Sequence, residues 1–121
     1  MKNKNILQSI RCAARGIVNC YKQERNFGEY TVIALIFLIF NVLLSSELWE
    51  YIVYFSLIAA AFSAEFLNTA IERIIDDYDG RINEKNKFIK DAAAASVLVV
   101  SAAFFLAEGL ILIPKLIARL S

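Results

Sequence analysis

The sequence predicts an all-α integral membrane protein, with one amphipathic helix on the membrane surface followed by three transmembrane helices. Of its 121 residues, 59% are hydrophobic, which is too many for an ordinary small soluble domain. Three apolar stretches reach, with their flanking residues, the roughly 17–25 residues that a helix needs to cross a bilayer. The segment before them is too polar to span, but its apolar residues recur at helical spacing. The whole chain, 1–121, is expected to form a single domain.

The surface helix is expected over residues 4–25. Its apolar residues form one face and its basic residues another: Ile6, Ile10, Ala13, Ile17 and Tyr21 against Arg11, Arg15 and Lys22. Such a helix lies in the plane of the membrane, where Lys and Arg reach anionic lipid headgroups. The segment does not resemble a signal peptide, because its charges are scattered and it has no compact apolar core or cleavage site.

The three spans are expected over about 29–46, 50–72 and 92–113. The second span continues as a helix to about Asp76. A charged connector, residues 77–90, joins the second span to the third, and Pro114 ends the third. Glu108, near the far end of the third span, is expected to reach headgroups or Lys115 and is assigned no chemistry.

The Lys and Arg residues predict the orientation of the spans. Six of them lie in residues 1–29 and five in residues 73–90, whereas the 45–50 turn has none and two follow the third span. Cytosolic segments carry the excess of Lys and Arg, so the amino terminus and the connector are expected on the cytosolic side. Trp49 and Tyr51, beside the turn, suit the opposite membrane interface.

Composition argues against several functions. The formal net charge is +1, so no overall basic balance points to nucleic acid. The absence of His removes the commonest general base and the commonest zinc ligand. Cys12 and Cys20 lack the CxxC spacing of metal sites and are expected to be reduced cytosolic thiols. The usual nucleotide signatures, G-x-x-x-x-G-K-[ST] and H-R-D, are absent as well.

A stripe of polar residues runs along the second span. At about 100° per residue, Glu65, Asn68, Glu72 and Asp76 fall within a sector of roughly 80°. A charged group at bilayer depth costs about 2.5–3.5 kcal/mol on the insertion scale, and such residues are functional by default. The alternative is that they only hydrogen-bond neighbouring helices. Glu65 and Glu72 are two helical turns apart, roughly 10 Å, with Asn68 between them as a neutral donor.

This spacing suits phosphoryl transfer. Glu65, in an apolar environment, is suited to take a proton from an alcohol, whereas Glu72, nearer water, suits Mg²⁺. Glu24, where the surface helix meets the membrane, is the expected second metal ligand. Lys90 and Asp91 are expected to open the third helix, where free N–H groups and the positive dipole end favour phosphate. Asp91 also suits an N-cap, and Lys90 could serve only as an interfacial lysine.

The chain resembles the bacterial integral-membrane diacylglycerol kinase/undecaprenol kinase family in two elements, E-F-L-N-T-A-I-E-R-I-I-D at 65–76 and K-D-A-A-A-A-S-V at 90–97. The E-R-N-F at 24–27 is similar to the form common in the undecaprenol kinase branch. The separation of these elements and the three-span layout match too, so the resemblance covers nearly the whole chain. The family's E-Y-H-like triplet in the connector is here Arg81-Ile82-Asn83.

The resemblance implies roles for the site residues. Glu65 would be the catalytic base and would bind the lipid hydroxyl. The metal would be bound by Glu24 and Glu72, and ATP by these two together with Lys90 and Asp91. Asn68 and Asp76 would support the site. The family forms homotrimers in the bacterial plasma membrane, with active sites shared between subunits.

Residues and resemblance together predict a kinase that uses ATP and Mg²⁺ to phosphorylate a membrane lipid alcohol. Undecaprenol is favoured over diacylglycerol by the E-R-N-F element alone. Two alternatives remain: an ion or proton conductor, which would need Glu65 but not Glu24 or Lys90, and an inactive kinase homologue that acts in assembly. A homo-oligomer is expected because one chain offers too few helices to enclose the polar stripe. The small residues from Ala92 to Ser96 would let helices approach closely.

Overall fold

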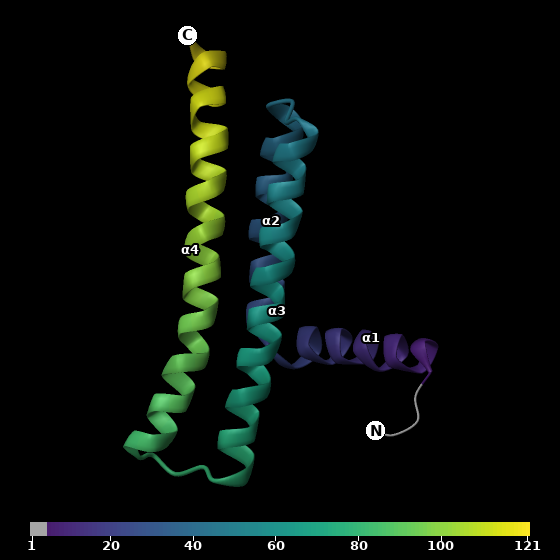
Figure 1. Cartoon of the computed structure of the whole chain (residues 1–121), viewed down its shortest axis with the longest axis vertical. Helices are drawn as coiled ribbons and strands as arrows, with labels where there is room; N and C mark the ends of the chain where they lie inside the picture. The colour runs from purple at the N-terminus through teal and green to yellow at the C-terminus, as the bar shows by residue number, and fades with distance from the viewer. Residues whose placement is uncertain (1–4) are drawn as a thin grey trace. The chain divides into compact units, whose positions relative to one another are not determined.

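The computed structural model describes residues 5–121 and is helical throughout, which confirms the all-α class (Figure 1). The four helices are α1 (Ile6–Gln23), α2 (Arg25–Leu43), α3 (Leu48–Tyr78) and α4 (Glu84–Leu120). The chain divides into two compact units, 1–36 and 37–121, so α2 begins in the first unit and ends in the second. The expected start of the surface helix at residue 4, and the charges of Lys2 and Lys4, lie outside the described residues.

In the first unit, the break between α1 and α2 falls at Glu24. The backbone there is extended, at φ −122° and ψ 115°, while the Glu24 N–H still donates to Cys20 O at 2.9 Å. The rings of Tyr21 and Phe27 lie on either side of the break, 5.6 Å apart. The Tyr21 hydroxyl also hydrogen-bonds Thr31 Oγ1, and Thr31 donates to Phe27 O at 2.8 Å. These contacts join α1 to the start of α2 across the break at Glu24.

The first helix has no buried side chain. Its N-cap is Asn5, whose side chain accepts from Gln8 N at 2.8 Å, a cap that typically contributes about 1 kcal/mol to helix stability. Apolar residues such as Ile6 and Ile10 are exposed. Exposed apolar side chains are unfavourable in water, so this face agrees with a position on a membrane surface, which stays a prediction.

In the second unit, α3 and α4 form an antiparallel pair that packs along its length (Figure 1). Aromatic side chains fill the space between these helices and the end of α2. Phe104 on α4 lies 5.9 Å from the ring of Tyr54 on α3 and 5.1 Å from that of Phe37 on α2. Tyr54 and Phe104 are both buried. This cluster holds the three helices together at the end that lies away from the α3–α4 connector.

Two polar pairs, one fully buried and one partly buried, join the helices at that same end. Asn41 on α2 donates from Nδ2 to Glu108 Oε1 on α4 at 2.7 Å, and both residues are 0% exposed. Lys115 on α4 forms an ion pair with Glu50 on α3. The expectation that Glu108 reaches headgroups or Lys115 is therefore wrong. The amide of Asn41 lies within reach of Glu108, whereas Lys115 is two turns further along and meets Glu50 instead.

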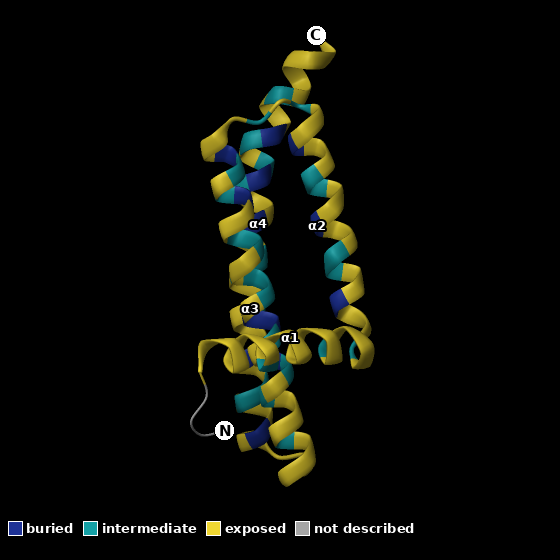
Figure 2. Ribbon diagram, turned by 90° about the vertical axis from the view of Figure 1, so that its right-hand side faces the viewer, coloured by how far each residue is buried: buried dark blue, intermediate teal, exposed yellow. Residues whose placement is uncertain are grey.

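The helices extend beyond the apolar stretches that define the spans. All of α2, α3 and α4 are long and apolar enough to cross a membrane. With 31 and 37 residues, α3 and α4 are about 46 and 56 Å long, against about 30 Å for the bilayer core. The sequence predicts that the third span ends at Pro114, but the helix continues through Pro114 to Leu120. Most of the helical surface is exposed, as Figure 2 shows, which leaves wide apolar faces for lipid or for further helices.

Candidate functional site

Three residues of the polar stripe lie together on one face of α3. Glu65 and Asn68 are 5% and 7% exposed, whereas Glu72, one turn further on, is exposed. Asn68 Nδ2 donates to Glu72 Oε1 at 3.0 Å. The amide thus orients one oxygen of the exposed carboxylate. The stripe runs from a buried acid to an acid in contact with solvent within two helical turns.

The other end of the Asn68 amide has no partner among the described residues. Asn68 Oδ1 is buried and accepts no hydrogen bond. A buried acceptor without a donor costs roughly 1–3 kcal/mol, so this atom is expected to meet a donor in the working protein. A hydroxyl group that approached Glu65 would lie close to this oxygen and could donate to it. Asn68 therefore faces the exposed acid with its donor, and its acceptor is open to a hydrogen bond from a ligand or from a neighbouring helix.

Two charged residues close the solvent end of the stripe. Lys90 Nζ on α4 donates to Asp76 Oδ1 on α3 at 2.6 Å. The two side chains are 39% and 55% exposed, so the pair is partly screened by water. Lys87 Nζ and Asp91 Oδ2 form a longer pair, 3.7 Å apart, within α4. Lys90 is thus held one turn beyond Glu72, where an anion near that carboxylate could reach it.

The expectation that Lys90 and Asp91 open a helix is wrong. Helix α4 begins at Glu84, and its N-cap is Asn83, whose side chain accepts from Asn86 N at 2.8 Å. The eight residues from Glu84 to Asp91 include no Gly or Pro, so nothing in them stops the helix. The backbone N–H groups of Lys90 and Asp91 are used inside the helix, and their contribution to anion binding must come from side chains.

The corner between α1 and α2 places Glu24 in the first unit. Glu24 is half-buried and follows the last residue of α1. Its pairing with Glu72 as a second metal ligand stays a prediction. Within residues 5–121, no group of three or more acidic, Cys or His side chains comes together as a metal cage. Glu72 could contribute one carboxylate to a metal, and Mg²⁺ at phosphate sites commonly takes further ligands from substrate and water.

The connector between α3 and α4 is only residues 79–83, because residues 84–90 of the expected connector are helical, and it is held by residues that the sequence reasoning missed. Asn86 is buried, and its Nδ2 donates to Asp79 Oδ2 at 2.6 Å and to Arg81 O at 2.8 Å. The spacing of Asn83 and Asn86 was the available signal, because a polar N-cap followed three residues later by a second hydrogen-bonding side chain is a helix start. The third span was instead predicted from the apolar stretch that begins at residue 92.

The arrangement offers three kinds of chemistry on one side of the α3–α4 pair. A buried carboxylate, Glu65, can accept a proton from a hydroxyl group. An exposed carboxylate, Glu72, supplies the hard oxygen donor that divalent cations such as Mg²⁺ prefer. A lysine, Lys90, can bind phosphate. Together these groups suit transfer of a phosphoryl group to an alcohol at the membrane boundary.

Comparison with known proteins points the same way. The family model for prokaryotic diacylglycerol kinase matches residues 11–112. The chain is 38% identical over 104 residues to undecaprenol kinase of Bacillus subtilis, which covers 86% of this chain and 85% of that protein. It is 30% identical over 115 residues to diacylglycerol kinase of Synechocystis sp., which covers 94% of this chain and 66% of that protein.

Proposed function

The chain belongs to the prokaryotic diacylglycerol kinase family, a family of membrane lipid kinases, and from this premise we propose that it phosphorylates undecaprenol with ATP and Mg²⁺. The observation that carries the proposal is the stripe on α3, where one amide links a buried acid to an exposed one. The lipid hydroxyl attacks the γ-phosphorus of ATP, a new oxygen–phosphorus bond forms, and ADP leaves. The products are the lipid phosphate, ADP and one proton.

Glu65 is the proposed base. Its carboxylate accepts the proton of the lipid hydroxyl as the new bond forms, and burial keeps bulk water from competing for it. Asn68 Oδ1, which has no partner among residues 5–121, accepts a hydrogen bond from the same hydroxyl before transfer and orients it. Glu65 and Asn68 thus bind the substrate alcohol from the membrane side.

The phosphates are held at the solvent end of the stripe. The donor set there fits Mg²⁺, because Glu72 is an exposed carboxylate and Asn68 fixes one of its oxygens. Glu24 is the proposed second ligand. When bound, Mg²⁺ neutralises charge on the transferring phosphoryl group. Lys90 binds phosphate oxygens through its ammonium, and Asp91 contacts the nucleotide.

Asp76 supports the site through Lys90. Its carboxylate holds Lys90 Nζ at 2.6 Å before ATP arrives, so the lysine is already directed toward the solvent end of the stripe. This preparation lowers the conformational entropy that the lysine side chain would lose on binding phosphate.

Undecaprenol is the proposed substrate for two reasons. The E-R-N-F element at 24–27 is the form common in the undecaprenol kinase branch. The identity with the undecaprenol kinase of Bacillus subtilis, 38%, exceeds that with the diacylglycerol kinase of Synechocystis sp., 30%. Diacylglycerol remains the competing acceptor, because both alcohols present a hydroxyl group at the membrane boundary.

The proposal includes a homotrimer with shared sites in the bacterial plasma membrane, with the amino terminus in the cytosol. The exposed apolar faces of the spans and the small residues from Ala92 to Ser96 support close association of helices. The cytosolic orientation follows from the Lys and Arg count and brings the solvent end of the stripe to the side where ATP is present.

A phosphate-transfer assay tests the function. The purified full chain in mixed micelles is given γ-³²P-labelled ATP, Mg²⁺ and either undecaprenol or diacylglycerol. We expect labelled lipid phosphate from undecaprenol. If diacylglycerol is labelled too, the kcat/KM for undecaprenol should be the larger. Equal or greater kcat/KM for diacylglycerol would overturn the substrate assignment, and no labelled lipid from either alcohol would overturn the kinase proposal for this chain.

A further inference from the structure

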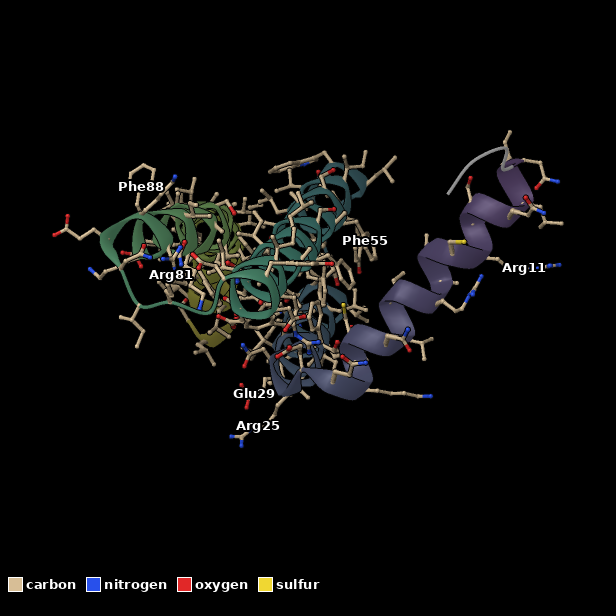
Figure 3. All side chains as sticks on the ribbon, turned by 90° about the horizontal axis from the view of Figure 1, so that it is seen from below. Arg11, Arg25, Glu29, Phe55, Arg81 and Phe88 are labelled. Atoms are coloured by element: carbon tan, nitrogen blue, oxygen red, sulfur yellow. The ribbon has the colours of Figure 1, made fainter. Side chains whose placement is uncertain are left out.

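A cavity of about 260 Å³ lies between the end of α3 and the start of α4. The ion pair of Lys90 with Asp76 lines one side of this cavity, and the connector lines the other. Its lining residues include Asp76, Arg81, Asn86, Lys87, Lys90 and Asp91. Figure 3 looks at this end of the second unit and labels Arg81 in the connector and Phe88 on α4. The shape of this cavity depends on how far apart the two helix ends are held.

A group of three side chains sets that separation. Asn86, only 6% exposed, donates from Nδ2 to Asp79 Oδ2 at 2.6 Å and to Arg81 O at 2.8 Å. The second oxygen of Asp79, Oδ1, accepts from Arg81 Nε at 2.6 Å. We call Asp79, Arg81 and Asn86 the connector clamp. One carboxylate oxygen of Asp79, the residue after α3, accepts from Asn86 in the first turn of α4, and the other accepts from Arg81 between the two helices.

The charge of Asp79 strengthens the clamp. The hydrogen bond from Asn86, and then the one from Arg81, hold the pKa of Asp79 below its usual range. Asp79 is therefore ionised at neutral pH, and its hydrogen bonds are charge-assisted, which makes them about twice as strong as neutral ones. Asn86 is the only member of the clamp that is buried.

The clamp goes beyond what closing a short turn needs. Gly80, at φ 68°, already ends α3, and Asn83 already caps α4. Asn86 lies one turn before Lys90 on the same face of α4, because residues four apart in a helix lie above one another. The contact of Asn86 with Asp79 therefore lies one turn from the contact of Lys90 with Asp76.

We propose that Asn86 is a positioning residue, which through the connector clamp holds the start of α4 so that Lys90 stays at Asp76 beside the phosphate end of the site. The catalytic consequence rests on the proposed function, while the structural consequence does not. Without the clamp, the first turns of α4 can move away from α3 and Lys90 loses its fixed place.

Distance measurements test the structural part. Tyr78 and Phe88 are 87% and 73% exposed, lie on opposite sides of the connector and belong to no part of the clamp. In full-length chains with Cys12 and Cys20 changed to Ser, Y78C and F88C are spin-labelled, diluted with unlabelled chains and measured in lipid nanodiscs. We expect a narrow distance distribution that broadens in Asn86→Ala. Asp79→Ala, which opens the clamp from its exposed side, should broaden it likewise.

The matched control is Asn83→Ala, which removes the cap of α4, a hydrogen bond from the backbone N–H of Asn86, and leaves the side-chain hydrogen bonds of the clamp in place. It should keep the narrow distribution. An unchanged distribution in both Asn86→Ala and Asp79→Ala would overturn the proposal. Equal broadening in Asn83→Ala would also overturn it, because helix capping alone would then account for the effect.

Kinetics test the catalytic part. If Lys90 binds phosphate, Asn86→Ala should raise KM for ATP about tenfold and leave kcat and KM for the lipid within about twofold, as loss of uniform binding does. A merely structural defect would instead lower kcat with both KM values unchanged, because fewer molecules would be active. In a Lys90→Met background, Asn86→Ala should add nothing further to the Kd for Mg·ATP, which is measured by equilibrium binding because chains that lack Lys90 are expected to be inactive. An equal additional rise there would overturn the link to Lys90.

The two proposals fail in different ways. If the chain transfers phosphate to no lipid but its distance distribution broadens in Asn86→Ala, the lipid kinase proposal is refuted and the structural proposal for the clamp is supported. An active kinase whose distances and KM for ATP do not change in Asn86→Ala would remove the clamp and leave the function standing.

Discussion

At the residue scale, Glu65 is the proposed base because it is the buried acid of the stripe. We expect Glu65→Gln to lower kcat by at least about 100-fold, since a general base contributes roughly 10²–10⁴ to the rate. The change keeps the size of the side chain and removes the basic oxygen. The measurement is transfer of labelled phosphate to undecaprenol under saturating ATP.

The chain offers a matched control for that variant. Glu108 is as buried as Glu65 but lies at the opposite end of the second unit, paired with Asn41. Glu108→Gln should insert into the membrane and keep kcat within about threefold of the original, because Glu108 touches no part of the proposed site. Near-normal turnover in Glu65→Gln would exclude Glu65 as the base.

Glu24 and Glu72 form the second residue-scale prediction. If both bind the metal that accompanies ATP, Glu24→Ala and Glu72→Ala should each raise KM for Mg·ATP about tenfold, or roughly 1.4 kcal/mol. The KM for Mg·ATP of the double variant should be little higher than that of the single variant with the higher KM, because the effects of residues that act as one unit are non-additive. Titration of Mg²⁺ at fixed ATP measures the effect. An unchanged Mg²⁺ dependence in Glu24→Ala would mean that the corner between α1 and α2 lies outside the site.

At the element scale, the ends of helices were harder to predict than their presence. Hydropathy marks the part of a helix that lies in lipid, so it identified three spans. The expected continuation of the second helix to about Asp76 comes close to the end of α3 at Tyr78, but the polar turns that start α4 at Glu84 were not predicted. Those turns contain helix-forming charged residues, and water solvates them without ending the helix. The prediction that Pro114 ends the third helix was wrong. A helix can pass through proline when other contacts, such as the ion pair of Lys115 with Glu50, hold its last turns.

In the site too, the arrangement within one helix could be predicted from the sequence, and the contacts between helices could not. Periodicity along one helix was enough to bring Glu65, Asn68 and Glu72 to a common face of α3, since three and four residues make about one turn. The pair of Lys90 with Asp76 could not be derived that way, because it joins two helices across a connector. Its formation depends on Asn86 and Asp79, whose contacts no single-helix pattern contains.

Gly80 gives an element-scale prediction at the end of α3. Its φ of 68° lies in the left-handed region, and a Cβ there would lie 3.3 Å from Asp76 O. We expect Gly80→Ala to reduce the free energy of unfolding by about 1–2 kcal/mol, the usual difference for an L residue in that conformation. Thermal unfolding in detergent measures it.

Gly16 in α1 is the control for this substitution. A Cβ at Gly16 meets nothing within 4 Å, and its φ lies outside the left-handed region. Gly16→Ala should leave stability unchanged or raise it by up to about 1 kcal/mol, because Ala is the better helix former. Equal stability losses in the two variants would mean that the left-handed turn does not determine the end of α3.

At the scale of the whole molecule, the orientation in the membrane is the first prediction. The amino terminus and the 77–90 connector should be cytosolic, and the 45–50 turn and carboxyl terminus external, because eleven of the thirteen Lys and Arg residues lie on the predicted inner side. Single cysteines in a cysteine-free chain, at Ser46 and at Tyr78, can be labelled with a membrane-impermeant reagent in intact cells. Labelling of Ser46→Cys is expected, and labelling of Tyr78→Cys alone would reverse the orientation.

Assembly is the second whole-molecule prediction. Most of the surface of α2, α3 and α4 is exposed, and in the apolar stretch of each helix only about 17% of the residues are buried. Glu72 and Lys90 therefore have few walls around them in one chain, although a site that holds a nucleotide and a lipid headgroup must exclude water. The small residues that follow Asp91 on α4 begin at the depth of the phosphate end and would let a neighbouring helix approach there.

Mixing inactive chains tests whether neighbours share a site. Glu65→Gln and Lys90→Ala chains should each be inactive alone. If Glu65 of one chain works with Lys90 of another, mixed trimers contain some intact sites, and activity should return to a substantial fraction of the original. The control is a chain that carries both substitutions. Mixed with either single variant it should restore no activity, because one of the two residues is then missing from every chain. Absence of recovery, where cross-linking shows that the subunits have mixed, would mean that each chain supplies Glu65 and Lys90 to its own site.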